Sequence, residues 1–206
     1  MLFFTKTVAY FCEICYNYVN GFDGENKGFS KVKIRFKRGI FMKFAIGDLL
    51  IYGETGVCRV DEIVEKEFLG EVVSCYKLCP LYQSCMIFTP VEGGNVFMRP
   101  IATRAEADAL LESVSKVEPD ICEINVPRVL SEHYDKIIKT HDCNEWIGLA
   151  VSIYAKRKRL IEQKKKLSAV DERFVKKAEE LIFGELAAAL GIDKASVREQ
   201  FTNNVK

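Results

Sequence analysis

The chain has 206 residues, of which 49% are hydrophobic and 29% are charged, with a formal net charge of +1. This composition excludes a disordered or collagen-like chain and is typical of one ordinary globular domain or two small ones. The near-zero net charge also excludes a chain-wide electrostatic bias toward nucleic acid, so any such binding would need a local basic stripe.

Residues 1–41 differ from the rest of the chain. They open with a stretch rich in Phe, Tyr and Cys, pass through a Gly- and Asn-containing segment, and end in a basic run at residues 31–38. We interpret them as a poorly ordered N-terminal extension or as a stretch that precedes a true start at Met42. A functional basic arm is the alternative interpretation.

The first residues lack the features of a secretory signal, and the longest apolar stretch is too interrupted to cross a membrane. Residues 1–22 contain Lys6, Glu13 and Asn17, whereas a span needs about 18 or more apolar residues in a row. We therefore expect a cytoplasmic protein with no membrane partner, whose eight cysteines are reduced thiols.

Short apolar runs separated by Gly and Pro turn signals follow Met42. The expected strands cover residues 49–52, 57–60, 72–78, 86–89 and 96–101. Five short strands at a spacing of about 10 residues favour a small antiparallel β-barrel of the Tudor or SH3 type over residues 42–101.

The periodicity becomes helical from residue 102 onward. Four residues have the chemistry and position of helix N-caps: Thr103, Asp142, Ser168 and Asp193. A linker is expected at residues 119–127 and another helix at 128–139, and Gly191 is expected to end the long helix that starts after Ser168. The predicted fold class is therefore α+β, with the β-barrel followed by an α-helical bundle over residues 102–206.

Sequence features of an enzyme are weak. Cys12 and Cys15 form a single C-x-x-C pair without a second pair at zinc-site spacing, and His133 and His141 are the only histidines. No nucleophile elbow or phosphate-binding loop is present. We expect no catalytic residues, metal, cofactor or small-molecule substrate, with a thiol- or metal-dependent enzyme as the less favoured alternative.

Residues 156–166 form a basic stripe with seven Lys or Arg and one acid, Glu162. The stripe could contact DNA phosphates, or it could be a solvated helix end. Lys156 and Arg159 fall on roughly the same face of the expected helix. Trp146, at the start of that helix, is expected in the core.

Several segments, in order, resemble the CarD/CdnL family of bacterial transcription regulators. The first is MKFAIGDLLIY at residues 42–52, and the second is GVCRVDEI at 56–63. Shorter matches follow at Gly70 and at residues 76–78, 89–90, 96–99 and 178–187. The resemblance covers about residues 42–200 in one register.

The resemblance implies a two-part function that needs no covalent chemistry. The N-terminal domain would be a Tudor-like RNA-polymerase-interacting domain that binds the polymerase β subunit. The helical domain would contact promoter DNA at the upstream edge of the transcription bubble and modulate open-complex stability. The alternative is a Tudor/KOW-like module that binds RNA or a ribosomal protein.

The resemblance also implies binding residues. The polymerase-binding residues would be Lys66, Phe88 and Arg99. The DNA-binding residues would be Arg128, Leu130 and Lys177, together with Lys156 and Arg159 from the basic stripe. The chain departs from the family at three places: Phe88 stands where Arg is common, Gly53 where many relatives have Pro, and Leu130 where relatives carry a Trp that wedges into the minor groove.

Overall fold

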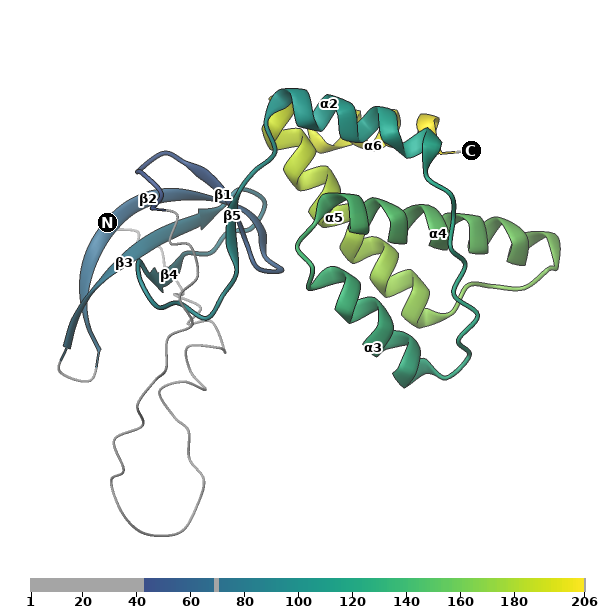
Figure 1. The fold of residues 1–206 in the computed structure, drawn as a ribbon, viewed down its shortest axis with the longest axis horizontal. Helices are drawn as coiled ribbons and strands as arrows, with labels where there is room; N and C mark the ends of the chain where they lie inside the picture. The colour runs from purple at the N-terminus through teal and green to yellow at the C-terminus, as the bar shows by residue number, and fades with distance from the viewer. Residues whose placement is uncertain (1–42, 69–70, 206) are drawn as a thin grey trace, which may run out of the picture. The chain divides into compact units, whose positions relative to one another are not determined.

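The computed structural model describes residues 43–68 and 71–205, so the predicted extension at 1–41 lies outside the described residues. The fold is α+β as predicted, with a five-stranded antiparallel sheet followed by helices (Figure 1). The strands are β1 (Leu49–Tyr52), β2 (Gly56–Phe68), β3 (Glu71–Pro80), β4 (Ile87–Pro90) and β5 (Met98–Pro100). The helices are α2 (Arg104–Ser113), the 3₁₀ turn η1 (Val114–Lys116), α3 (Pro127–Ile138), α4 (Cys143–Glu162), α5 (Ala169–Leu190) and α6 (Lys194–Asn204).

The sheet is open, with the strand order β4-β3-β2-β1-β5. Closure into the expected barrel would require β4 and β5 to pair, but these strands have four and three residues and occupy opposite edges. The five strands therefore form an open sheet and not the closed barrel that the sequence predicted. The register places Lys77 opposite Phe88 on β3 and β4, and Ile51 opposite Arg99 on β1 and β5.

Packing divides the chain into two compact units. The first, here called the sheet unit, includes the described residues 43–48, 59–68 and 71–95, and the second, the helical unit, includes residues 49–58 and 96–205. The helical unit thus contains β1, β5 and the turn after β1 as well as all described helices. The domain boundary that the sequence suggested between residues 101 and 102 stays a prediction.

The core of the sheet unit forms around Tyr76, which is 1% exposed. The backbone N–H of Phe44 donates to the Tyr76 hydroxyl at 3.0 Å, and the two rings meet edge to face at 6.3 Å between centroids. Cys75 and Leu78 on the same strand are fully buried. Cys75 therefore fills core volume as a small side chain.

The helices α2, α4, α5 and α6 each begin at a capping residue that the sequence predicted. Thr103 and Glu106 form a complete capping box at α2. The side chains of Asp142, Ser168 and Asp193 each accept a backbone N–H in the first turn of α4, α5 and α6. Each such cap contributes about 1 kcal/mol because it satisfies an N–H that has no partner within the helix.

The core of the helical unit lies along α4 and α5. Trp146 is 0% exposed, and its indole N–H donates to the carbonyl of Ile138 at 3.1 Å, which confirms the predicted core position. α5 ends at Gly191, whose φ of 70° gives the left-handed C-cap that the sequence predicted.

The turn after β1 depends on a glycine at position 53. Gly53 has φ +48°, and a Cβ added there would lie 2.9 Å from Cγ1 of Val96. Its N–H donates to the carbonyl of Phe97 at 2.9 Å. The absence of proline at this position therefore does not leave a loose turn, because the backbone is held by a hydrogen bond and close packing.

Candidate polymerase-binding and DNA-binding surfaces

Two of the residues that the sequence proposed for polymerase binding lie together in the sheet unit. The ammonium of Lys66 on β2 sits 3.2 Å from the ring centroid of Phe88 on β4. Both side chains are half-buried, and β4 is an edge strand. A cation over an aromatic face is stabilised by about 0.5–1 kcal/mol at an exposed site, so the ring fixes where the charge is presented.

Lys77, the other lysine near this cluster, has its positive charge balanced by two acids. Lys77, opposite Phe88 in the register, contacts Glu62 at 3.0 Å and Asp61 at 3.2 Å. The hydrogen bond to Glu62, assisted by the one to Asp61, raises the pKa of Lys77. Lys77 is therefore satisfied within the sheet, whereas Lys66 has its charge against a neutral ring.

Exposed apolar side chains on the sheet unit were not predicted. Ile63 on β2 and Val72 on β3 are 47% and 68% exposed, and Leu81 and Tyr82 in the following turn are 38% and 44% exposed. The sequence pattern cannot distinguish these exposed side chains from core side chains, because both kinds are apolar. Such side chains add apolar area to a protein-binding surface.

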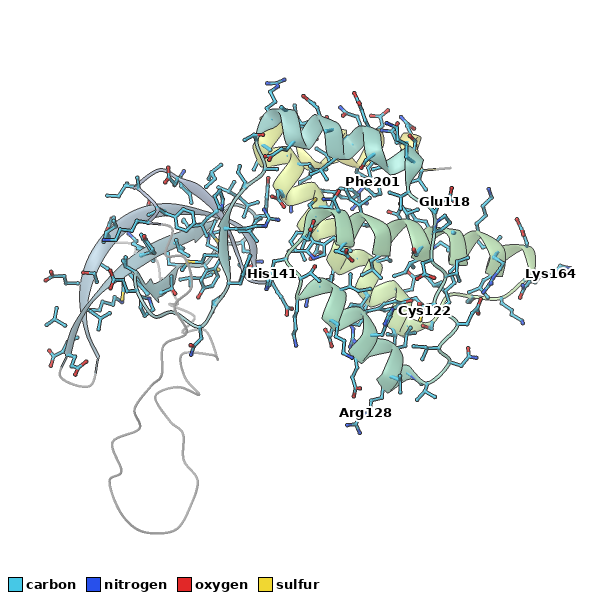
Figure 2. The ribbon with its side chains drawn as sticks, in the orientation of Figure 1. Glu118, Cys122, Arg128, His141, Lys164 and Phe201 are labelled. Atoms are coloured by element: carbon cyan, nitrogen blue, oxygen red, sulfur yellow. The ribbon has the colours of Figure 1, made fainter. Side chains whose placement is uncertain are left out.

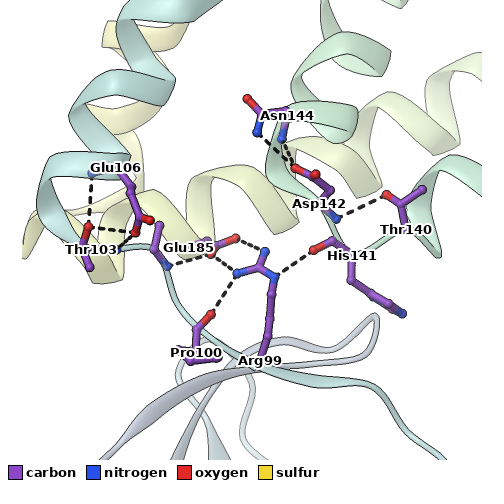
Figure 3. Close-up of polar contacts among 10 residues, drawn as sticks. Arg99, Pro100, Thr103, Glu106, Thr140, His141, Asp142, Asn144 and Glu185 are labelled. Carbon is purple, nitrogen blue, oxygen red and sulfur yellow. Dashed lines mark hydrogen bonds and ion pairs between the residues drawn. The ribbon is translucent and has the colours of Figure 1, made fainter. Parts of the chain in front are cut away.

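Arg99, the third predicted polymerase-binding residue, is used inside the helical unit (Figure 3). Its guanidinium forms a bidentate pair with Glu185 of α5, with N···O distances of 2.5 and 2.8 Å. Its Nε donates to the carbonyl of His141 at 2.8 Å, and Nη1 donates to that of Pro100 at 3.0 Å. Glu185 is fully buried and also accepts the backbone N–H of Ala102. The geometry gives Arg99 an internal structural role, and its polymerase contact stays a prediction.

His141 lies beside this pair in the loop before α4. Its ring stacks on Phe97, with centroids 4.5 Å apart and planes 7° from parallel. Burial lowers the pKa of His141, aided by the nearby charge of Arg99 and opposed by Glu54. The imidazole is therefore neutral at pH 7, and His141 is a packing residue rather than a solvated one.

Leu130 is buried in the helical core at 3% exposed, on the same face of α3 as Tyr134 and Ile138. Its side chain therefore offers no surface for the wedge that the sequence suggested. Two other apolar side chains at the start of α3 are exposed, Val126 at 57% and Val129 at 46%.

The N-terminus of α3 also carries an exposed cation. The Arg128 side chain is 89% exposed, and among the described residues its ion-pair partner is Glu132, at 3.1 Å on the next turn (Figure 2). The N-cap residue Val126 makes no side-chain cap, so the first N–H groups of the helix are free of that interaction. A helix N-terminus of this kind, beside a cation, suits a phosphate group.

Two cations of the predicted basic stripe are engaged by acids of the helical unit. Lys156, only 12% exposed, contacts Asp171 at 3.0 Å, and Arg159 contacts Glu123 at 2.6 Å. These acids lie 15 and 36 residues away in the sequence. The two side chains therefore have less charge to offer DNA than the sequence pattern indicated.

Lys177, the last predicted DNA-binding residue, forms an ion pair with Glu54. Four lysines that the sequence analysis placed in or beside the stripe remain exposed and have no ion-pair partner among the described residues: Lys158, Lys164, Lys165 and Lys166. The predicted DNA-binding residues are thus distributed between the core, internal ion pairs and the start of α3, and they do not form one continuous surface.

Asp171 lies at the centre of a buried polar network at the start of α5. It accepts hydrogen bonds from the Tyr134 hydroxyl at 2.8 Å, the Ser168 hydroxyl at 2.7 Å and the Lys156 ammonium at 3.0 Å. Burial alone would raise the pKa of Asp171, but these three bonds outweigh it and lower the pKa. The network joins α3, α4 and α5 through one ionised carboxylate.

The described residues offer little for other classes of site. No group of three or more His, Cys, Asp or Glu among them is arranged to hold a metal ion. None of the helices in residues 43–205 combines the length and apolar character that a membrane crossing needs.

A comparison with protein families matches residues 44–102 to the CarD-like/TRCF RID domain. A search among curated proteins gave no match. The matched range contains all five strands and the Lys66–Phe88 cluster. RID denotes an RNA-polymerase-interacting domain, which indicates a transcription-associated protein. Residues 44–102 therefore form a domain of the CarD-like/TRCF RID family. This match supports the assignment of the chain as a CarD-like family member.

Proposed function

We propose that this chain is a non-enzymatic transcription regulator that binds the β subunit of RNA polymerase and the upstream edge of the promoter bubble. Binding there would modulate the stability of the open complex. The observation that carries the proposal is the Lys66–Phe88 cluster, which lies at an edge strand within the matched domain.

The edge strand β4 suits docking by strand addition. Among the described residues, β4 pairs with β3 on one side and with no strand on the other, so its outer backbone groups can pair with a strand of the partner. Backbone pairing would fix the pose, and Lys66 over Phe88 would supply a cation and an aromatic face beside it. The exposed Val72 and Tyr82 add apolar area in the same unit.

The start of α3 is the surface that we propose for DNA. Val126 and Val129 provide exposed apolar groups, and Arg128 provides a cation. The N-terminus of the helix provides backbone N–H groups that can bind a phosphate. These groups are few, so affinity for free DNA should be modest. Docking on polymerase would raise the effective concentration of this surface at the promoter.

Lys66→Glu is expected to weaken binding to purified β-subunit fragments by about tenfold or more, since it removes the cation from Phe88 and adds an acid. Surface plasmon resonance on the full chain measures the change. Lys43→Glu is the matched control, because it makes the same charge reversal at a lysine of the same unit whose side chain is 77% exposed. Equal losses in the two variants, or no binding of the parent chain to β, would contradict the proposal and favour an RNA or ribosomal partner.

Replacement of both Arg128 and Val129 by Glu is expected to shorten the lifetime of open complexes formed with the protein while leaving β binding unchanged. The change removes a cation and an exposed apolar group from the proposed DNA surface, and the effect should shrink as salt rises. Heparin-challenge kinetics on a promoter fragment provide the measurement. Lys139→Glu, at the other end of α3, is the control. Tight binding of the unmodified protein to free duplex at physiological salt would argue against delivery by polymerase.

A further inference from the structure

The helical unit contains a surface groove that the polymerase and DNA proposals do not use. It has a volume of about 500 Å³ and lies between the C-terminal half of α4 and the end of α6. Its apolar residues are Tyr154, Ile161 and Val205. Ile161 is 65% exposed, whereas Tyr154 is anchored by a hydrogen bond from its hydroxyl to Glu179 at 2.5 Å. The groove therefore has a fixed aromatic wall and an accessible aliphatic side chain.

The rim of the groove is mainly cationic. Arg157 and Lys158 line it, with Glu162 as the one lining acid. Arg157 is held in place by Glu172 at 2.9 Å and by the Tyr154 ring, 5.7 Å from its guanidinium carbon. Lys158 is exposed and has no ion-pair partner among the described residues.

More positive charge follows directly after α4. Lys164, Lys165 and Lys166 are exposed in the turn that leaves the helix, and Figure 2 labels Lys164 at that turn. The turn is ordered by backbone hydrogen bonds from Lys164 to Ile161 and from Lys165 to Leu160. The groove thus opens beside three exposed lysines that have no ion-pair partner among the described residues.

We propose that this groove binds an acidic amphipathic peptide segment of a protein partner. Apolar side chains one helical turn apart would cover Ile161 and Val205, and carboxylates of the segment would meet Lys158 and the lysines after α4. A nucleic-acid backbone fits less well, because phosphates would leave the apolar side chains uncovered. The inference does not depend on binding to polymerase or to promoter DNA.

Selection of random peptides of about four helical turns on the immobilised full chain tests the proposal. The expected peptides are rich in Asp and Glu and carry apolar residues at i and i+3 or i+4. Synthetic copies are then titrated by fluorescence anisotropy. Ile161→Asp and Lys158→Glu should each weaken binding by about tenfold, since each removes one anchor and adds a like charge.

Two controls make the result specific. Ile46→Asp introduces the same change at an isoleucine that is 64% exposed in the sheet unit, and Lys43→Glu reverses an exposed lysine there. Neither should affect peptide binding, and Trp146 fluorescence verifies that the helical unit, which contains the groove, is folded in each variant. No enriched peptide, enrichment of basic or neutral peptides, or equal losses in variants and controls would overturn the proposal. The proposal would also be overturned, in favour of nucleic acid, by a duplex oligonucleotide that displaces the peptide and whose own binding is weakened by Ile161→Asp.

Discussion

Glu185→Ala is expected to lower the free energy of unfolding of the helical unit by about 3 kcal/mol. The substitution leaves the Arg99 guanidinium, 23% exposed, without its carboxylate, and an unpaired charge in such a place typically costs about 3–5 kcal/mol. We expect the lower end of this range because water still reaches part of the arginine. The backbone N–H of Ala102 also loses its acceptor.

Urea unfolding followed by tryptophan fluorescence measures this loss. Trp146 is the single tryptophan of the chain, is fully buried in the same unit and has the Arg99 guanidinium carbon 5.8 Å from its ring centroid. Glu180→Ala is the control, because Glu180 is an exposed acid on the same helix.

A double variant separates the net contribution of the ion pair to the free energy of unfolding from the destabilisation caused by leaving one partner unpaired. Arg99→Met with Glu185→Met replaces both partners by apolar side chains, and it should be within about 1–2 kcal/mol of the parent chain. If Glu185→Ala proved as stable as Glu180→Ala, the pair would have no structural role and Arg99 would be available for a partner.

Asp171→Asn is expected to destabilise the same unit by about 2–3 kcal/mol at pH 7. The carboxamide cannot neutralise the Lys156 ammonium, which is only 12% exposed, and it can accept fewer of the three hydrogen bonds that converge on this position. Asp108→Asn, at an exposed position of α2, is the control and should be nearly neutral.

The loss at Asp171 should depend on pH in one direction. The folded chain lowers the pKa of this carboxyl, so its ionised form stabilises the fold above the ordinary pKa of an unfolded aspartate, about 4. As the pH falls through the lower pKa of the folded state, that stabilisation disappears. The difference between the parent chain and Asp171→Asn should therefore shrink below about pH 4 in urea titrations. A difference that stayed constant from pH 7 to pH 3 would show that the charge of Asp171 contributes nothing.

Local patterns predicted where most elements of this fold begin, although β2 continues to Phe68, well past the expected 57–60. Capping depends on residues within one turn, so Thr103 with Glu106, and Ser168 with Asp171, identified helix starts that the structure confirms. Gly191 ended α5 for an equally local reason, its positive φ. Local patterns could not predict whether the sheet closes into a barrel, because closure depends on pairing between the two short edge strands β4 and β5.

The candidate sites were harder to predict because their partners are distant in sequence. Arg99 and Glu185 are separated by 86 residues, and Arg159 and Glu123 by 36, so no pattern showed that these cations were already paired. Leu130 is different, because its four-residue spacing from Tyr134 and Ile138 was a signal of burial that the family resemblance overrode. Lys66 and Phe88 were suggested only by resemblance, each as a polymerase-binding residue, and their contact with one another required the structure.

The conformation of Gly53 has a consequence for anyone who borrows residues from relatives to improve this protein. The family resemblance implies proline at this position in many relatives, yet proline is confined to φ near −65° and has no N–H, whereas this position has φ +48° and donates to Phe97. Even alanine would crowd Val96. Engineering guided by relatives should therefore keep glycine at this position, because proline is incompatible with the present backbone.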